Sequence, residues 1–314
     1  MNRRNLTALV VIAVIASLSL VLTGCPKDTT GPTIYFLAKD GVNIDKKGDT
    51  TIILYTKYVD PGYYVEDNAS KSADIQVETT TDLPLESKVA AHMGEVKKTG
   101  DYTFTYKATD EAGNLGTRSK KITVKNVSDI YTGMYLTMRD EIPSGLGLDV
   151  CNDTTYYSNI TSLKSVAGGL RFSKVAAHKK NDGTKVSFKV DAMLYSQDHS
   201  PRTASDQLGY MGSAEDKEQH KFDGLSYEAV VDSIRLDYVY LQIKTQEYTA
   251  YTESDAADSE YKVRIQGRLE ADGKTPKSKI VYSDRGVMLY IELNLSLTIG
   301  NTSVQNYVER YYLE

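Results

Sequence analysis

The sequence has 314 residues, with 37 Lys and Arg against 42 Asp and Glu. The resulting net charge of −5 argues against nucleic-acid binding, which requires clustered positive charge. Of the two cysteines, Cys25 and Cys151, neither has a disulfide partner if Cys25 is modified, so hydrophobic cores must stabilise the fold. Tyrosine is abundant, at 24 residues, which favours β-structure, and the length suffices for two domains.

Residues 1–24 have the pattern of a secretory signal peptide. Arg3 and Arg4 precede an almost wholly apolar run from Leu6 to Leu22. The run is shorter than the roughly 20 apolar residues that a spanning helix needs. A cleaved signal is therefore favoured over a permanent membrane helix.

The run ends in Leu22-Thr23-Gly24-Cys25, which resembles the lipobox of bacterial lipoproteins at all four positions. The resemblance implies that Cys25 carries a diacylglycerol and becomes the first residue of the mature chain. Two or more acyl chains make such an anchor stable, and residues 25–32 would form the lipidated tether. We therefore expect a protein held to the outer membrane by lipid.

Pro26-Lys27-Asp28 follows and is similar to the export signal of surface lipoproteins in Bacteroidetes-type bacteria. Lys27 and Asp28 would then direct the protein to the cell exterior. An ordinary polar linker is the alternative interpretation, which leaves the inner leaflet of the outer membrane open.

Residues 33–125 are predicted to form a first β domain. Tyr102, Phe104, Tyr106 and Ala108 alternate with polar residues, as in a half-buried strand, and the segment 110–114 supplies Gly113 for a hairpin turn. Further strands are expected at 51–55, 74–78 and 121–124.

This region resembles a bacterial immunoglobulin-like domain. The resemblance is carried by a D-P-G turn at 60–62 and by the pattern G-x-Y-x-x-x-Y-x-A-x-D-x-x-G-N at 100–114. It implies a sandwich of about seven strands that serves as a spacer or binding module, without catalytic residues. Tyr102 would occupy the corner position that ties down a loop in immunoglobulin folds.

Acidic and amide turn residues of this domain are candidate calcium ligands: Asp60, Glu66, Asp67, Asn68 and Asp110. They lack the regular alternating spacing of a calcium loop. Turn chemistry accounts for the same residue types, so no metal site is predicted.

Residues 125–129 are expected to form a short polar joint, after which 130–314 are predicted to fold as a larger antiparallel β domain. Alternation is clear over 186–194, 263–269 and 287–299, and the last strand is expected at 304–312. Hairpin turns are expected at 181–183, 271–274 and 283–286. The fold class is therefore all-β, with either a closed lipocalin-like barrel or a two-layer sandwich in this half.

Catalysis has little support, because the four histidines are scattered and no catalytic or phosphate-binding motif is present. No cofactor is expected. The paired carboxylates of a glycoside hydrolase are a spatial feature and form the residual alternative.

A candidate ligand site lies in the segment 196–224, which has no sustained strand period. Tyr210 and Met211 are an apolar pair inside it, and they could fold back over the mouth of the sheet to contact a ligand. A solvated insertion is the alternative interpretation.

The overall arrangement resembles lipoproteins that accompany polysaccharide-uptake systems on Bacteroidetes-type cells. It implies a non-catalytic, surface-exposed module that binds extracellular glycan and has an outer-membrane uptake complex as a partner. The alternative is a structural or adhesive lipoprotein that binds another envelope protein.

Overall fold

The structure is a computed structural model, and it describes residues 27–38, 44–45, 47–88, 93–139, 155–180, 182–195 and 226–313. The chain divides into two compact units. One comprises 1–48, 60–82 and 103–121, and the other comprises 49–59, 83–102 and 122–314. Among the described helices, none has the length and apolar character needed to cross a membrane.

The chain up to residue 125 contributes two sheets. One has the order β2 (Ile44–Asp45), β1 (Thr33–Leu37), β4 (Tyr63–Glu66); the other has the order β3 (Thr50–Ile53), β7 (Leu115–Lys125), β6 (Gly100–Thr109), β5 (Gln76–Thr81). Apolar side chains of the first unit meet in one core: Ile34, Phe36, Val65, Ile75, Tyr106 and Ala108. The immunoglobulin-like identity of these sheets stays a prediction.

The hairpin predicted between β6 and β7 is present. The backbone N–H of Asp110 donates to the carbonyl of Asn114 (3.2 Å), and Gly113 has φ +88°, a left-handed conformation that favours glycine. Tyr102 also ties down a loop as predicted, because its hydroxyl donates to the carbonyls of Lys98 (3.1 Å) and Thr99 (3.2 Å).

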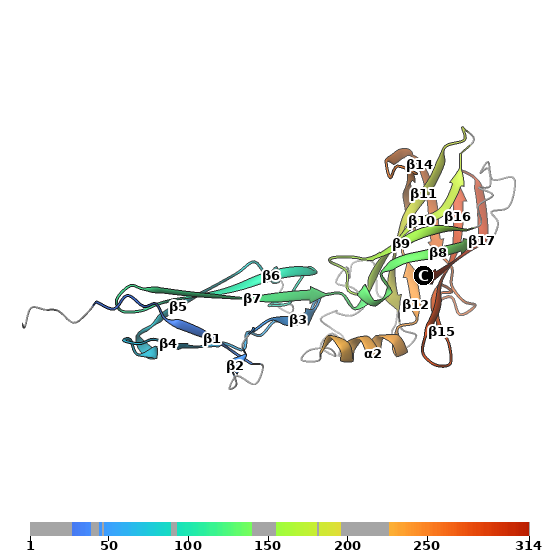
Figure 1. Ribbon diagram of the computed structural model, residues 1–314. Helices are drawn as coiled ribbons and strands as arrows, with labels where there is room; N and C mark the ends of the chain where they lie inside the picture. The colour runs from blue at the N-terminus through green and yellow to red at the C-terminus, as the bar shows by residue number, and fades with distance from the viewer. Residues whose placement is uncertain are drawn as a thin grey trace, which may run out of the picture. The chain divides into compact units, whose positions relative to one another are not determined.

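The larger β domain is a closed barrel, so of the two predicted alternatives the barrel is the one present (Figure 1). Within the described residues, eight antiparallel strands follow one another around the ring: β8 (Gly133–Arg139), β9 (Thr155–Ser162), β10 (Gly169–Lys179), β11 (Lys185–Tyr195), β13 (Gln246–Thr252), β14 (Ala257–Gly267), β16 (Met288–Ile299) and β17 (Thr302–Leu313). The ring closes where β17 pairs with β8, for example Tyr311 opposite Thr137.

Two short strands, β12 (Tyr240–Ile243) and β15 (Lys279–Tyr282), complete one end of the ring. The C-terminal part of β11 pairs with β12, the N-terminal part of β16 pairs with β15, and β12 meets β15 at Tyr240 and Lys279. They continue the hydrogen bonding where β13 and β14 do not reach.

The barrel interior holds the core. Along β11, Val186, Phe188, Val190, Ala192 and Leu194 are buried while the residues between them are more exposed, as the alternation predicted. In β16 the prediction is wrong at the start of the strand. Ile291 to Leu297 carries the buried face, but Val287 and Leu289 are exposed because they lie at the end of the barrel.

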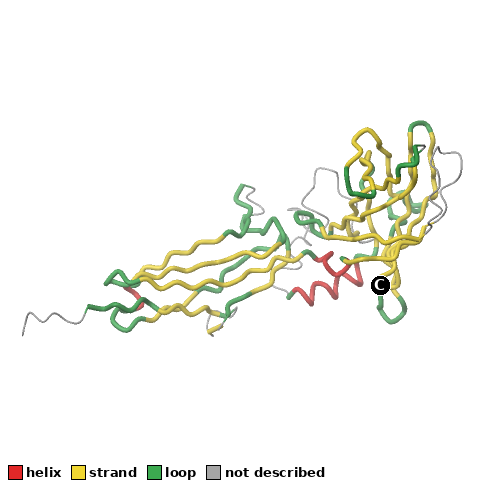
Figure 2. The backbone as a smooth tube through the Cα atoms, turned by 45° about the horizontal axis from the view of Figure 1, so that its top comes forward, coloured by secondary structure: helices red, strands yellow, loops and turns green. Residues whose placement is uncertain are grey.

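Helix α2 (Tyr227–Asp237) is an element that the sequence pattern does not predict. It is drawn in red in Figure 2. Ser226 caps it by accepting from the N–H of Ala229 (3.2 Å), and Val230, Val231 and Ile234 are buried among its described side chains.

The last three residues of the polar joint expected at 125–129 belong instead to a 3-10 helix, η3 (Val127–Tyr131). The Asn126 side chain caps this helix, and Val127, Ser128 and Tyr131 are buried. The predicted division into domains at 33–125 and 130–314 stays a prediction, but the segment between them is not a solvated linker.

Candidate functional site

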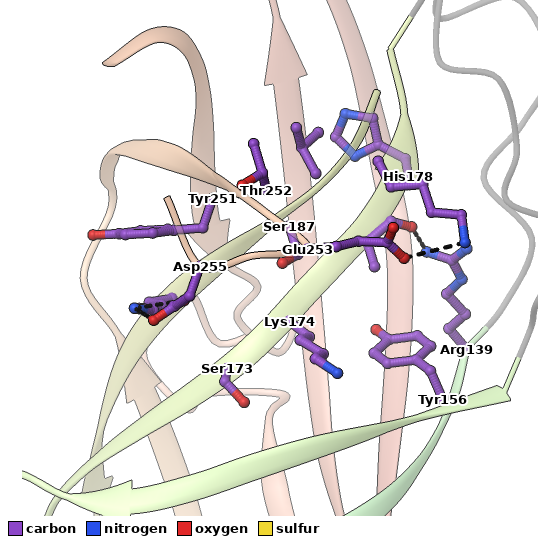
Figure 3. A pocket seen from close by; sticks show the side chains of 14 residues that line it. Arg139, Tyr156, Ser173, Lys174, His178, Ser187, Tyr251, Thr252, Glu253 and Asp255 are labelled. Carbon is purple, nitrogen blue, oxygen red and sulfur yellow. Dashed lines mark hydrogen bonds and ion pairs between the residues drawn. The ribbon is translucent and has the colours of Figure 1, made fainter. Parts of the chain in front are cut away.

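A pocket of about 430 Å³ lies at the end of the barrel where the β10–β11 hairpin and the β13–β14 turn meet. Its lining comes from β8, β9, β10, β11, β13 and that turn, and most of the side chains can hydrogen bond. The lining residues are Arg139, Tyr156, Ser173, Lys174, Ala177, His178, Lys185, Val186, Ser187, Lys189, Tyr251, Thr252, Glu253 and Asp255 (Figure 3). The volume falls within the range of small-molecule sites.

An irregularity in β10 shapes the pocket wall. The register of β10 against β11 shifts twice, between Phe172 and Val175 and between Val175 and His178. Lys174 (φ +56°) and Ala176 (φ +49°) adopt left-handed backbone conformations there. Such conformations cost non-glycine residues on the order of 1 kcal/mol each, so surrounding contacts must hold them.

The contact that holds this bulge comes from β17, which is separated from β10 by β9 and β8 in the ring. Glu309 of β17 has no exposed surface, and its Oε1 accepts hydrogen bonds from the backbone N–H of Ala176 (2.7 Å) and the hydroxyl of Tyr156 (2.7 Å). The hydroxyls of Tyr307 and Tyr311 also donate to this carboxylate. Four donors suit an ionised carboxylate in a buried position.

The tyrosines around Glu309 are held in their neutral form. Burial raises the pKa of Tyr156, Tyr307 and Tyr311 far above the ordinary value, and the nearby charge of Glu309 raises it further. Their hydroxyls therefore remain donors across the physiological pH range. Tyr156 also lines the pocket, so it connects the pocket to the buried carboxylate.

Arg139 brings a positive charge to the buried side of the pocket. Its Nη1 donates to the carbonyl of Ala177, and its guanidinium lies 5.4 Å from the centre of the Tyr156 ring. Burial alone would lower the pKa of Arg139, but Tyr307, Tyr156 and Glu309 outweigh it and raise the pKa. Arg139 is therefore charged at every relevant pH.

His178 is the one described histidine of the chain, and it is buried beside the pocket. Its Nδ1 lies 2.7 Å from the carbonyl of Ala176 and its Nε2 lies 2.9 Å from the hydroxyl of Tyr261. Because a carbonyl can only accept, the proton is assigned to Nδ1. Burial lowers the pKa of His178, and Arg139 lowers it further, which favours the neutral ring.

The exposed rim of the pocket contains two ion pairs and an aromatic ring. Lys185 pairs with Glu253 (3.1 Å) and Lys189 pairs with Asp255 (2.9 Å). The ammonium of Lys189 also lies 4.1 Å from the centre of the Tyr251 ring. The Tyr251 side chain borders the pocket in Figure 3.

The arrangement is suited to hydrogen bonding with a polar ligand. Hydroxyls, ammonium groups and carboxylates can exchange hydrogen bonds with a hydroxyl-rich ligand, and the rings of Tyr156 and Tyr251 offer flat apolar faces. The rim acids Glu253 and Asp255 are each paired with a lysine.

Among the residues that the structure describes, none of the site residues predicted from the sequence lines this pocket. Tyr210, Met211 and the lipidation residue Cys25 lie outside the described residues. Lys27 is exposed, and Asp28 accepts hydrogen bonds from the N–H of Thr30 (3.1 Å) and from Asn68 (3.2 Å).

Turn hydrogen bonds engage two of the acidic turn residues of the first unit, and the absence of a metal site stays a prediction. Asp67 accepts from the N–H groups of Ala69 (3.0 Å) and Ser70 (2.8 Å), and Asp110 accepts from that of Asn114 (2.7 Å). One ligand atom each of Asp28, Asp67 and Asp110 lies within 4.8 Å of the other two. The two turns therefore face the tether residue Asp28.

Sequence reasoning missed the residues that line the pocket. They come from segments far apart in the chain, and none belongs to a recognised motif. The one local signal lies in β10, where Leu170 and Phe172 alternate with polar residues and the period then breaks at Lys174. Such a break is typical of a β-bulge, which is common next to binding sites.

No protein-family model matches the chain, and no curated protein matches it either. Solved structures similar to it include two from Bacteroides species. The lipoprotein BT2262 from Bacteroides thetaiotaomicron is 13% identical, over 90% of this chain and 100% of that one, with a TM-score of 0.20. The protein SGBP-B of the Bacteroides ovatus mixed-linkage glucan utilization locus, in complex with a mixed-linkage heptasaccharide, is 10% identical over 81% of this chain and 74% of that one, with a TM-score of 0.21. Similarities of this size carry no argument about function.

Proposed function

We propose that this chain is a lipid-anchored outer-membrane protein of a Bacteroidetes-type bacterium, displayed on the cell exterior, which binds extracellular glycan without catalysing its cleavage. The observation that carries the binding proposal is the barrel-end pocket, because it combines hydrogen-bonding side chains with the rings of Tyr156 and Tyr251. Sugars present hydroxyls at the ring edge and C–H groups on the ring faces, which such a lining complements. An uptake complex in the same membrane is the partner that we propose.

The absence of catalysis is part of the same proposal. Glycoside hydrolysis uses two carboxyl groups, one of which must donate a proton to the leaving group. Glu253 and Asp255 lie on the exposed rim, and each is engaged in an ion pair with a lysine. Glu309 already accepts four hydrogen bonds inside the barrel.

The test is affinity gel electrophoresis of the mature Cys25→Ala protein against a panel of neutral and acidic polysaccharides. We expect retardation by at least one glycan. Ser187→Trp, which places a large ring in the pocket, should abolish it, whereas Ser296→Trp on the outer face of β16 should not. Equal retardation of both variants would place the glycan site elsewhere.

A protein-binding role is the second candidate, and an apolar row on the outside of the barrel favours it. Leu136 of β8 pairs with Tyr157 of β9 on one side and with Tyr312 of β17 on the other. The ring of Tyr290 lies 5.4 Å from that of Tyr312. Met134, Met138 and Tyr157 are each about half exposed. Contiguous exposed apolar surface is typical of protein contacts.

The row is tested by cross-linking intact envelopes that carry wild-type protein or Met138→Lys. Loss of one specific envelope-protein adduct in the variant, with no glycan retarding the wild type, would favour the adhesive role over glycan binding.

A further inference from the structure

We infer that the glycan bound by the barrel-end pocket is acidic, carrying carboxylate or sulfate groups, and that Lys174 contacts the anionic group. This inference rests on the proposed function and specifies its ligand class. The charge of the pocket is the first support. Four basic side chains, Arg139, Lys174, Lys185 and Lys189, line it against two acidic ones, Glu253 and Asp255, so the balance is +2. Counting the buried Glu309 behind Tyr156 still leaves +1.

The pocket has the opposite sign to the protein as a whole, whose net charge is −5. A basic site on an acidic protein selects for anions, since the remaining surface repels them. A pocket for neutral sugars needs no such excess of positive charge.

The excess charge is not spread evenly over the lining. Lys185 and Lys189 are paired with the rim acids at 3.1 Å and 2.9 Å. Lys174 has no ion-pair partner among the residues that the structure describes. Its exposed side chain extends toward Tyr156 in Figure 3. It is therefore the cation best placed to gain a ligand anion as its partner.

The backbone at this position is held in place. Lys174 has a left-handed conformation, at φ +56°, in a bulge whose next irregular residue, Ala176, is hydrogen bonded to Glu309. This anchored bulge fixes where the Lys174 side chain leaves the wall. A lysine in a regular stretch of β10 would point either into the core or along the outer face.

Arg139 supports the same ligand class from the buried side. Its exposed fraction is 7%, and a charge in such a position is screened less by solvent than a surface charge. Its hydrogen bond to the Ala177 carbonyl and its contact with the Tyr156 ring keep it in place. It contributes positive potential at the base of the pocket, whereas Lys174 makes the direct contact.

The experiment measures binding of the mature Cys25→Ala protein to two matched pairs of polymers by isothermal titration. Polygalacturonate is compared with its methyl ester, and dextran sulfate with dextran, so that the carboxylate and sulfate sources are distinguished. We expect at least one acidic member to bind, and its neutral counterpart to bind about tenfold more weakly or worse, a difference of about 1.4 kcal/mol. Added NaCl should weaken the binding.

The residue assignment is tested with the polymer that binds. Lys174→Gln should weaken binding about tenfold, and Lys174→Arg should restore most of it. Lys262→Gln, which removes an exposed lysine on the outer face of β14, should leave the affinity unchanged. If Lys174→Gln unfolds, Lys174→Gly suits the left-handed backbone and removes the same charge.

Two results would overturn the inference. Equal binding of acidic and neutral members would reject the acidic ligand, and unchanged affinity in Lys174→Gln would reject the contact. After either result, the proposed glycan function still holds if the Ser187→Trp variant loses binding. If none of the polysaccharides binds, the proposed function and this inference fail together.

Discussion

Glu309 is an acidic residue whose side chain is surrounded by hydrogen-bond donors in the barrel core. It is fully buried and accepts hydrogen bonds from Tyr156, Tyr307, Tyr311 and the N–H of Ala176. The carboxylate thereby links β17 to the bulge of β10, which forms the pocket wall. A buried charge of this kind is maintained by its complete set of donors.

We predict that Glu309→Ala lowers the free energy of unfolding by about 3–5 kcal/mol, because three hydroxyls and an amide lose their acceptor inside the barrel. Glu309→Gln should be less harmful because it keeps one acceptor oxygen. Urea unfolding followed by circular dichroism measures both. The control Glu247→Ala, at an exposed position of β13, should change stability by less than about 0.5 kcal/mol. If Glu309→Ala and the control lost similar amounts of stability, the result would show that the three hydroxyls and the amide hydrogen bond to water in the variant.

His178 predicts a pH dependence of stability. Its pKa is lowered from the ordinary 6.5, chiefly by burial and further by Arg139, so the folded protein binds fewer protons there than the unfolded chain. The stability that depends on a neutral His178 is fully present above pH 6.5. It declines as the pH falls below 6.5, because the unfolded chain then takes up a proton that the folded protein does not bind. One such group changes stability by at most about 1.4 kcal/mol per pH unit.

The measurement is the melting temperature of wild type and His178→Gln between pH 8 and pH 5. We expect the variant to be the less stable protein at high pH and the gap to narrow as the pH falls below 6.5. A gap that stays constant across this range would contradict the buried neutral histidine.

At the scale of elements, η3 depends on a single buried side chain. Asn126 has no exposed surface; its Nδ2 donates to the carbonyls of Leu163 and Val166, both at 2.8 Å, and its Oδ1 accepts from the N–H of Gly168 at 2.8 Å. One amide thus satisfies backbone groups of the β9–β10 connection that would otherwise be buried without partners.

We predict that Asn126→Ala costs about 3 kcal/mol, since several buried backbone groups lose their partner at once. Limited proteolysis should leave the wild-type segment from Lys125 to Thr132 intact and cut it in the variant. Asn159→Ala, at an exposed position of β9, is the matched control and should behave as wild type. Early cleavage of the wild type in this window would contradict the stabilising role of buried Asn126.

The elements that could be predicted are those whose signal is local. The alternation in β11 and β14, the existence of β17 and the turn at Gly113 follow from residues a few positions apart. Helix α2 was not predicted, although Ser226 and the buried Val230 and Ile234 have helical spacing. The sequence just before it shows no regular hydrophobic period, so the start of an element was not recognised there.

The pocket could not be predicted, because its signal is not local. It depends on β10 being bulged and on Glu309 lying within reach of Ala176, 133 positions away in the chain. Nothing in the local pattern around either residue indicates that contact. Arg139 and Lys174 also enter the pocket from different strands, so their joint charge appears only when the ring is closed.

At the scale of the whole molecule, the lipid is the anchor that we predict. Cys25→Ala should move the protein from the envelope fraction to the soluble fraction, because acyl chains supply the attachment. Its far-ultraviolet circular dichroism should match that of wild type. Membrane fractionation with a salt wash is the measurement, and a Cys25→Ala protein that still sediments with the envelope would refute the lipoprotein assignment.

The pairing of β17 with β8 also decides when the barrel can fold. The two strands contribute Leu313 and Tyr135 to the same rung, so the ring cannot close until the last residues of β17 have been synthesised. Until then β8 and β16 are open edges that can pair with other chains. Such long-range closure makes folding slow. A chain that is released before β17 is complete lacks both the closing strand and Glu309, and it is therefore expected to aggregate rather than to form a smaller barrel.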